Sequence, residues 1–378
     1  MKPLTNLRRQ WLVVTLIWGV LLFGSYAILQ FYWPYATRWL LISTGASVYI
    51  LHVLWRNLPN NHRQGETTLL PTFGLGNNLT LIRGIIISFL TGCILSPWPT
   101  GGYAWVPGLL YLATTVLDYG DGYIARARNE VTVLGHKLDL TLDSFGTLAL
   151  TTLVVWYGQL PIFFLGMGFL YYLFVAGIKW REWRGLPVYP IHPSRHRRIF
   201  GGFYMVFLGC AFAPVLAPEV TTLAGFVFGI PVAVGFLRDW LVTIGTIDSA
   251  SPTYQRMRHG SYILVAQWLP VFMRILLFLT MMMVYANVAI YIDTNPYTNG
   301  MIWLNGFMKG TIIITTIAMS FGFLGRVPPT GLILPIVVEL YHHELQVYNG
   351  LALACAISLM LVSTGYYSFL PDLRRDKF

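Results

Sequence analysis

Apolar residues recur along most of the chain in runs that are long enough to cross a bilayer as helices. A spanning helix needs about 17–25 predominantly apolar residues, and short polar links separate runs of this length. The apolar segment 330–341 fits either a further span or a re-entrant helix, and 255–269 fits a helix in the membrane interface. The pattern predicts spans over residues 11–33, 38–55, 79–97, 104–123, 138–158, 160–178, 199–217, 219–237, 270–292, 301–323 and 349–369.

Composition supports the same class of protein. Of the 378 residues, 56% are hydrophobic and 11% are charged, whereas soluble domains carry about 25% charged residues. We therefore predict an all-α, polytopic membrane bundle and exclude a soluble enzyme with a single anchor. The three cysteines lie far apart in apolar runs, so they indicate neither a metal site nor a disulfide framework. The first apolar segment has no small-residue cleavage site and is interpreted as a retained anchor.

The net charge of +10 raises the question of nucleic acid, but the positions of the basic residues argue against it. They cluster in short links between apolar runs, as in 126–137 and 179–198, which is the positive-inside pattern and also attracts anionic lipid headgroups. With the N-terminus in the cytoplasm, Arg38 alone falls in an outer loop. The basic C-terminal tail reaches the cytoplasm if 330–341 spans, which favours a twelfth span.

Four aspartates stand out in this apolar chain. Only fifteen Asp and Glu residues are present, and Asp118, Asp121, Asp139 and Asp143 fall within 26 positions. Carboxylates near a bilayer are costly and mark functional sites by default. Spacings of three and four place each pair on one helix face. Two such pairs on facing helices form an all-oxygen site for hard cations such as Mg²⁺ or Mn²⁺.

The order of residues around these aspartates resembles a known signature. The pattern D-x-x-D-G-x-x-A-R, eight residues, then G-x-x-x-D-x-x-x-D begins at Asp118 and ends at Asp143. It resembles the signature of the class I CDP-alcohol phosphatidyltransferase family at every fixed position. The resemblance implies a six-helix core over about 70–245. We expect accessory helices in 1–60, the core in 61–250 and further accessory helices in 251–378.

The resemblance also implies a reaction and its catalytic residues. An acceptor hydroxyl would displace CMP at the β-phosphorus of a CDP-alcohol, in phospholipid biosynthesis. Two divalent ions, Mg²⁺ or Mn²⁺, would be held by Asp118, Asp121 and Asp139, with Asp143 touching the second ion and accepting the proton of the acceptor.

Further residues are expected to bind the two substrates. Lys179, Arg181 and Arg195 resemble basic positions that line an acceptor pocket, although positive-inside charge places cations in the same loop. For some donor-site residues, an ordinary helix cap or close helix packing is the competing interpretation. The residues expected to contact the CDP-alcohol are Asn78, Thr80, Gly122, Ala125, Arg126, Thr132 and Gly135.

Several alternatives stay open at this point. The donor could be CDP-diacylglycerol with a polar or phosphorylated alcohol as acceptor. It could instead be a soluble CDP-alcohol with diacylglycerol as acceptor, as in choline/ethanolamine-type enzymes. A transporter or scaffold that keeps the bundle without chemistry is a different class of function. Membrane lipids are expected partners, a homodimer is possible, and the active site is expected near the cytoplasmic face of the cell membrane.

Overall fold

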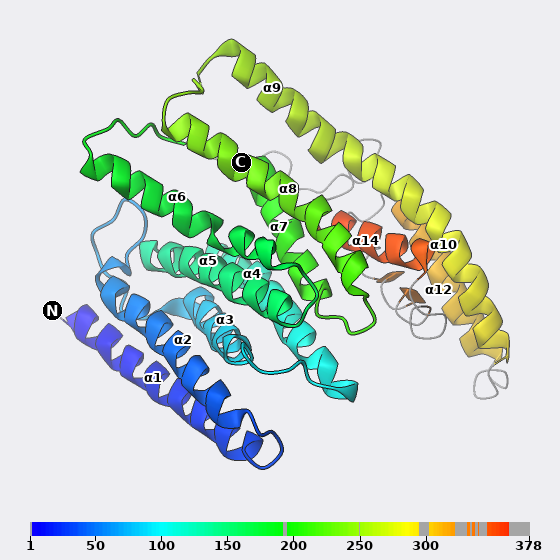
Figure 1. The fold of residues 1–378 in the computed structure, drawn as a ribbon, viewed down its shortest axis with the longest axis horizontal. Helices are drawn as coiled ribbons and strands as arrows, with labels where there is room; N and C mark the ends of the chain where they lie inside the picture. Colours follow the sequence, from blue (N-terminus) through cyan, green and yellow to red (C-terminus); the bar gives the residue numbers. More distant parts are fainter. Residues whose placement is uncertain are drawn as a thin grey trace. The chain divides into compact units, whose positions relative to one another are not determined.

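The computed structural model describes residues 2–191, 195–248, 250–294, 302–321, 331, 332, 335, 336, 339 and 346–362 (Figure 1). Over these residues no strand forms, and every predicted span overlaps a helix, so the all-α membrane fold is confirmed. The segment 330–341 lies largely outside the described residues. The helices are α1 (Lys2–Leu29), α2 (Ala36–Asn57), α3 (Gly74–Gly92), α4 (Val106–Ala127), α5 (Val133–Trp156), α6 (Leu165–Trp183), α7 (Arg195–Cys210), α8 (Pro218–Thr243), α9 (Pro252–Ile263), α10 (Leu269–Thr294), α12 (Ile302–Ser320) and α14 (Val347–Val362).

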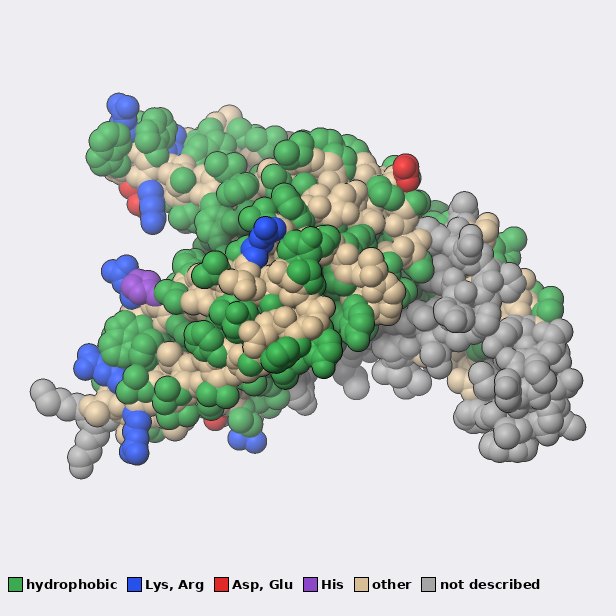
Figure 2. Space-filling model, turned by 60° about the horizontal axis from the view of Figure 1, so that its bottom comes forward, with side chains coloured by type: hydrophobic (Ala, Val, Ile, Leu, Met, Phe, Trp, Pro, Cys, Tyr) green, Lys and Arg blue, Asp and Glu red, His purple; other side chains and the backbone are tan. Residues whose placement is uncertain are grey.

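Five helical segments in the described part are long and apolar enough to cross a membrane. They are Pro3–Leu29, Val133–Trp156, Ile162–Trp183, Pro218–Thr243 and Leu269–Ile290. In the apolar stretch of α5, 50% of the residues are buried, whereas in that of α1 only 11% are buried. α5 is therefore a central helix, whereas α1 turns apolar side chains outward. Figure 2 shows this apolar surface in green, with Lys and Arg side chains gathered mainly toward one end of the view.

The chain divides into two compact units, residues 1–185 with 204–236 and residues 186–203 with 237–378. In the first unit, α3 packs against α2, α4 and α5. A Cβ on Gly76 would lie 2.8 Å from the Cβ of Ala125, so a glycine is needed where α3 crosses α4. Trp18 of α1 donates to Ser47 of α2 over 3.0 Å. The first two helices thus belong to the same packed body as α3–α5.

The two ends of the first unit are built from different links. At one end, Arg63 forms an antiparallel bridge with Thr132. Glu130 accepts a 3.0 Å hydrogen bond from the backbone N–H of Leu75 at the start of α3, where a negative charge is favourable. At the other end, Arg38 donates to the carbonyl of Leu95. The basic residue predicted for the outer face thus lies at the opposite end from Arg63.

In the second unit, α9, a π-helical turn over Leu264–Trp268 and α10 form one continuous helical stretch. The proposed interfacial segment 255–269 is therefore helical and runs directly into α10, although its depth in a membrane stays a prediction. Glu339 is buried and accepts hydrogen bonds from Asn287 of α10 and Tyr348 of α14.

Candidate metal and nucleotide site

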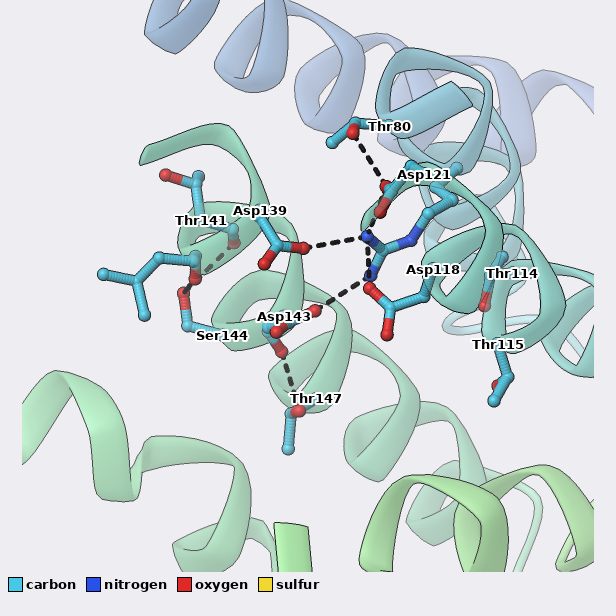
Figure 3. Close-up of polar contacts among 12 residues, drawn as sticks. Thr80, Thr114, Thr115, Asp118, Asp121, Asp139, Thr141, Asp143, Ser144 and Thr147 are labelled. Carbon is cyan, nitrogen blue, oxygen red and sulfur yellow. Dashed lines mark hydrogen bonds and ion pairs between the residues drawn. The ribbon is translucent and has the colours of Figure 1, made fainter. Parts of the chain in front are cut away.

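The four aspartates of the signature meet between α4 and α5. Asp118 and Asp121 come from α4, and Asp139 and Asp143 come from α5; Figure 3 shows their carboxylates turned toward a common centre. We call these four residues the aspartate cluster. Ligand oxygens of Asp118, Asp121 and Asp139 all lie within 4.8 Å of one another. Asp121 lies six residues before the end of α4, and Asp139 lies six residues after the start of α5. Each is therefore about 9 Å along its helix from the α4–α5 loop.

The centre of the aspartate cluster holds the guanidinium of Arg83, which comes from α3 and is 5% exposed. Its Nη1 lies 2.5 Å from Asp118 Oδ1, and its distances to Asp121 Oδ2 and Asp139 Oδ1 are 3.2 and 2.9 Å. Its Nη2 lies 2.9 Å from Asp143 Oδ1. No role is predicted for Arg83 from the sequence. The available signal was an arginine in an apolar helix, which needs a counter-charge.

Thr80 supports the most buried member of the aspartate cluster. Its hydroxyl donates to Asp121 Oδ2 over 2.8 Å and also lies 3.1 Å from the carbonyl of Gly76. The hydroxyl is thus engaged with a carboxylate, one turn before Arg83. Its predicted contact with the nucleotide stays a prediction.

The two neighbouring asparagines differ in their surroundings. Asn77 is buried and donates to the carbonyl of Phe73 over 2.8 Å and to Thr132 Oγ1 over 3.2 Å. Asn78, the predicted donor-binding residue, is exposed. Its amide can therefore be reached by a ligand, whereas that of Asn77 fastens α3 to the α4–α5 loop.

Thr132 and Gly135 shape the start of α5. Thr132 is the N-cap residue, and its Oγ1 accepts a 3.0 Å hydrogen bond from the backbone N–H of Gly135, the usual way to satisfy a free helix N–H. A Cβ on Gly135 would lie 2.4 Å from Asn77 Oδ1. Both residues therefore have local structural roles, beside which the predicted nucleotide contacts stay predictions.

Gly122, Ala125 and Arg126 lie on the last turns of α4 and differ in what they contact. Ala125 packs on Gly76 of α3. The nearest atom to a Cβ on Gly122 would be the Nη1 of the exposed Arg126, at 3.2 Å. Because that atom is the end of a flexible side chain, close helix packing does not explain Gly122. The space beside Gly122 and the exposed guanidinium of Arg126 suit the approach of a phosphate.

A small pocket continues from the aspartate cluster into the first unit. Asp118, Asp143 and Arg83 form one wall, and the hydroxyl of Thr147 lies on the same pocket. Thr147 Oγ1 donates to the carbonyl of Asp143 over 2.7 Å. The other lining residues are Ile87, Tyr111, Thr114, Thr115, Leu142, Gly146 and Met205.

The predicted acceptor residues are located as follows. Lys179 and Arg181 lie in the last two turns of α6, where Lys179 is exposed. Arg195 begins α7, and its side chain lies outside the described residues. Their convergence on one acceptor stays a prediction.

The donor set of the aspartate cluster fits a hard divalent cation. Mg²⁺ and Mn²⁺ prefer oxygen ligands, and three carboxylates stand close enough to share one ion. Four carboxylates against one guanidinium leave a formal charge of minus three. The site can therefore accept further positive charge.

Fold and site together define an integral membrane protein whose central helices hold an acidic site with oxygen donors suited to a cation. Residues 73–231 match the family model described as CDP-alcohol phosphatidyltransferase. These residues run from the start of α3 into α8 and contain the whole signature. The resemblance that the signature predicts is therefore confirmed over this segment. The match covers none of α1, α2 or the helices after α8. No curated protein and no solved structure matches the chain.

Proposed function

We propose that this protein transfers a substituted phosphate group from a CDP-alcohol to an acceptor hydroxyl and releases CMP, in phospholipid biosynthesis. One observation carries the proposal: α4 and α5 bring all four aspartates of the signature to one centre, inside the segment that matches the family. An intact acidic site in a membrane is expensive to keep without a function. This argues for an enzyme over a scaffold or transporter.

We assign different roles to the residues of the aspartate cluster. Asp118, Asp121 and Asp139 would hold the divalent ions, two of Mg²⁺ or Mn²⁺ by the family resemblance, which would neutralise the donor diphosphate. Asp143 stands outside the trio of closest carboxylates and lines the adjoining pocket. It would also touch the second ion. We assign it as the base that accepts the proton of the acceptor hydroxyl. As the acceptor oxygen bonds to the β-phosphorus, the bond from that phosphorus to the CMP oxygen breaks.

Residues toward the end of α4 would hold the nucleotide part of the donor. Arg126 offers a forked set of donors to a phosphate, and the missing side chain of Gly122 leaves room beside it. Asn78 is exposed, and by the family resemblance its amide would also contact the donor. Thr80, Ala125, Thr132 and Gly135 would shape this donor site mainly by fixing α3, α4 and the start of α5 in place.

Two kinds of acceptor are compatible with the site. With CDP-diacylglycerol as donor, the acceptor would be an alcohol or a phosphorylated alcohol, and Lys179, Arg181 and Arg195 would bind its phosphate. The alternative is a soluble CDP-alcohol with diacylglycerol as acceptor, as in choline/ethanolamine-type enzymes. We favour the first, because basic residues cluster in the link after α6.

We place the site near the cytoplasmic face of the cell membrane, with membrane lipids around the bundle. The aspartate cluster lies toward the end that carries Arg63 and Arg126, away from Arg38. Positive-inside charge supports a cytoplasmic position for that end. A homodimer is compatible with this arrangement.

The direct test supplies purified protein with CDP-diacylglycerol and with soluble CDP-alcohols in turn, each with candidate acceptors and Mn²⁺. We expect CMP and a new phospholipid, identified by mass spectrometry, from CDP-diacylglycerol. A product formed from diacylglycerol and a soluble CDP-alcohol would establish the alternative reaction. Folded protein that forms no product with any pair would contradict the proposed function.

A further inference from the structure

Arg83 occupies the place where a cation would sit in the aspartate cluster. Its Nη1 lies within 3.2 Å of one oxygen from each of Asp118, Asp121 and Asp139. These are the three carboxylates whose ligand atoms are close enough to hold one metal ion. The guanidinium nitrogen thus stands where a divalent ion would be coordinated.

The contacts of Arg83 are concentrated on carboxylates. Each Nη carries two hydrogens, yet Nη1 alone has three carboxylate oxygens around it. The buried Nε has no hydrogen-bond partner in the described part of the protein. Among the residues that the structure describes, the hydrogen bonds and ion pairs of the guanidinium all go to the aspartate cluster, so this cluster sets its position.

We infer that Arg83 is a built-in counter-ion that holds the aspartate cluster together in the metal-free protein and competes with the divalent ion for it. The inference rests on the proposed metal site. Carboxylates this close repel one another strongly when no cation lies between them. When an ion enters, Nη1 must withdraw from Asp118, Asp121 and Asp139, whereas Nη2 can keep its contact with Asp143. Arg83 is thus a positioning residue that sets the metal affinity of the site.

The competition has a measurable consequence. The ion binds only those molecules in which Nη1 has withdrawn. The apparent affinity for the ion is therefore the intrinsic affinity multiplied by the fraction of molecules in that arrangement. Removing the guanidinium removes this reduction and also removes a like charge beside the ion. Both effects tighten ion binding, while the metal-free protein loses the charge that offsets four carboxylates.

The test measures metal binding without any substrate. Wild type, Arg83→Met, Arg83→Lys and the control Arg128→Met, which removes an exposed arginine at the end of α4, are purified with Mn²⁺. After Mn²⁺ is removed, titration is followed by the electron paramagnetic resonance signal of free Mn²⁺. We expect Arg83→Met to bind Mn²⁺ at least about tenfold more tightly than wild type, and Arg128→Met to bind like wild type.

Thermal unfolding supplies the second readout. In EDTA, Arg83→Met should have a lower Tm than wild type, and Mn²⁺ should raise its Tm by more. Arg83→Lys keeps a cation with a shorter reach, so its Mn²⁺ affinity should lie between those of wild type and Arg83→Met.

Three results would overturn the inference. They are Mn²⁺ binding by folded Arg83→Met that is no tighter than that of wild type, a Tm of Arg83→Met in EDTA equal to that of wild type, and Mn²⁺ binding by Arg83→Lys that is weaker than that of wild type. If Arg83→Met does not fold even with Mn²⁺, Arg83→Lys alone decides. CMP release plays no part in these readouts. If the affinities follow the predicted order but no CMP is released, the proposed function is contradicted and the inference about Arg83 stands.

Discussion

Asp143 and Asp118 both contact Arg83, but the proposed reaction gives them different roles. Asp143→Asn removes the base and should lower the rate of CMP release by about 10²–10⁴-fold while some CDP-donor binding remains. Asp118→Asn removes a primary ligand of the ion that holds the diphosphate, so both turnover and donor binding should be lost. CMP release and equilibrium binding of a CDP-donor check the two variants. Near-normal turnover in Asp143→Asn would disprove the base assignment.

Two glycines of the signature should respond differently to a methyl group. In Gly135→Ala, the new Cβ would lie 2.4 Å from Asn77 Oδ1, which should destabilise the protein by about 1–3 kcal/mol. In Gly122→Ala, the nearest atom is the end of Arg126 at 3.2 Å, so the Tm should change little while KM for the donor rises. Thermal unfolding and initial rates test the pair. An equal loss of Tm in both would show that Gly122 also serves packing.

At the scale of helices, the contact between α3 and α4 fixes the distance from Arg83 to the aspartate cluster. Gly76→Ala should lower the Tm, because its Cβ would lie 2.8 Å from that of Ala125. Gly120→Ala is the matched control in α4, where the nearest atom is a Leu79 methyl at 4.0 Å. Alanine favours a helix over glycine by about 1 kcal/mol, so the control should be neutral or stabilising. A Tm that falls equally in both variants would contradict this account of α3–α4 packing.

The same scale separates what the sequence can predict from what it cannot. Apolar run length predicts the helices, and spacings of three and four predict that each aspartate pair shares a face, because both follow from helix geometry. The place of Arg83 depends on α3 packing against both α4 and α5, which no local pattern encodes. The rotation of α3 likewise decides that Asn77 is buried and Asn78 is exposed. The junction of α9 with α10 depends on a π-helical turn without a clear sequence signal.

At the scale of the whole molecule, the distribution of basic residues predicts how the chain crosses the membrane. Cysteines introduced at Arg128 and Arg184 should resist an impermeant thiol reagent in intact cells. A cysteine at Tyr32, which is 84% exposed in the link between α1 and α2, should react. Wild type controls for Cys93, Cys210 and Cys355. Labelling of the cysteine at Arg128 or Arg184 without labelling at Tyr32 would show that the topology is the reverse of the predicted one, with the site near the outer face.

If the aspartate cluster performs a transfer that depends on divalent ions, CMP release should require both the ions and an intact cluster. Purified wild type and Asp143→Asn are stripped with EDTA and assayed with CDP-diacylglycerol and candidate acceptors, before and after Mn²⁺ or Mg²⁺ is restored. We expect CMP from wild type after the ion is returned, none in EDTA, and little from Asp143→Asn. Equal rates with and without the ion, or equal rates in the two proteins, would contradict this role of the aspartate cluster.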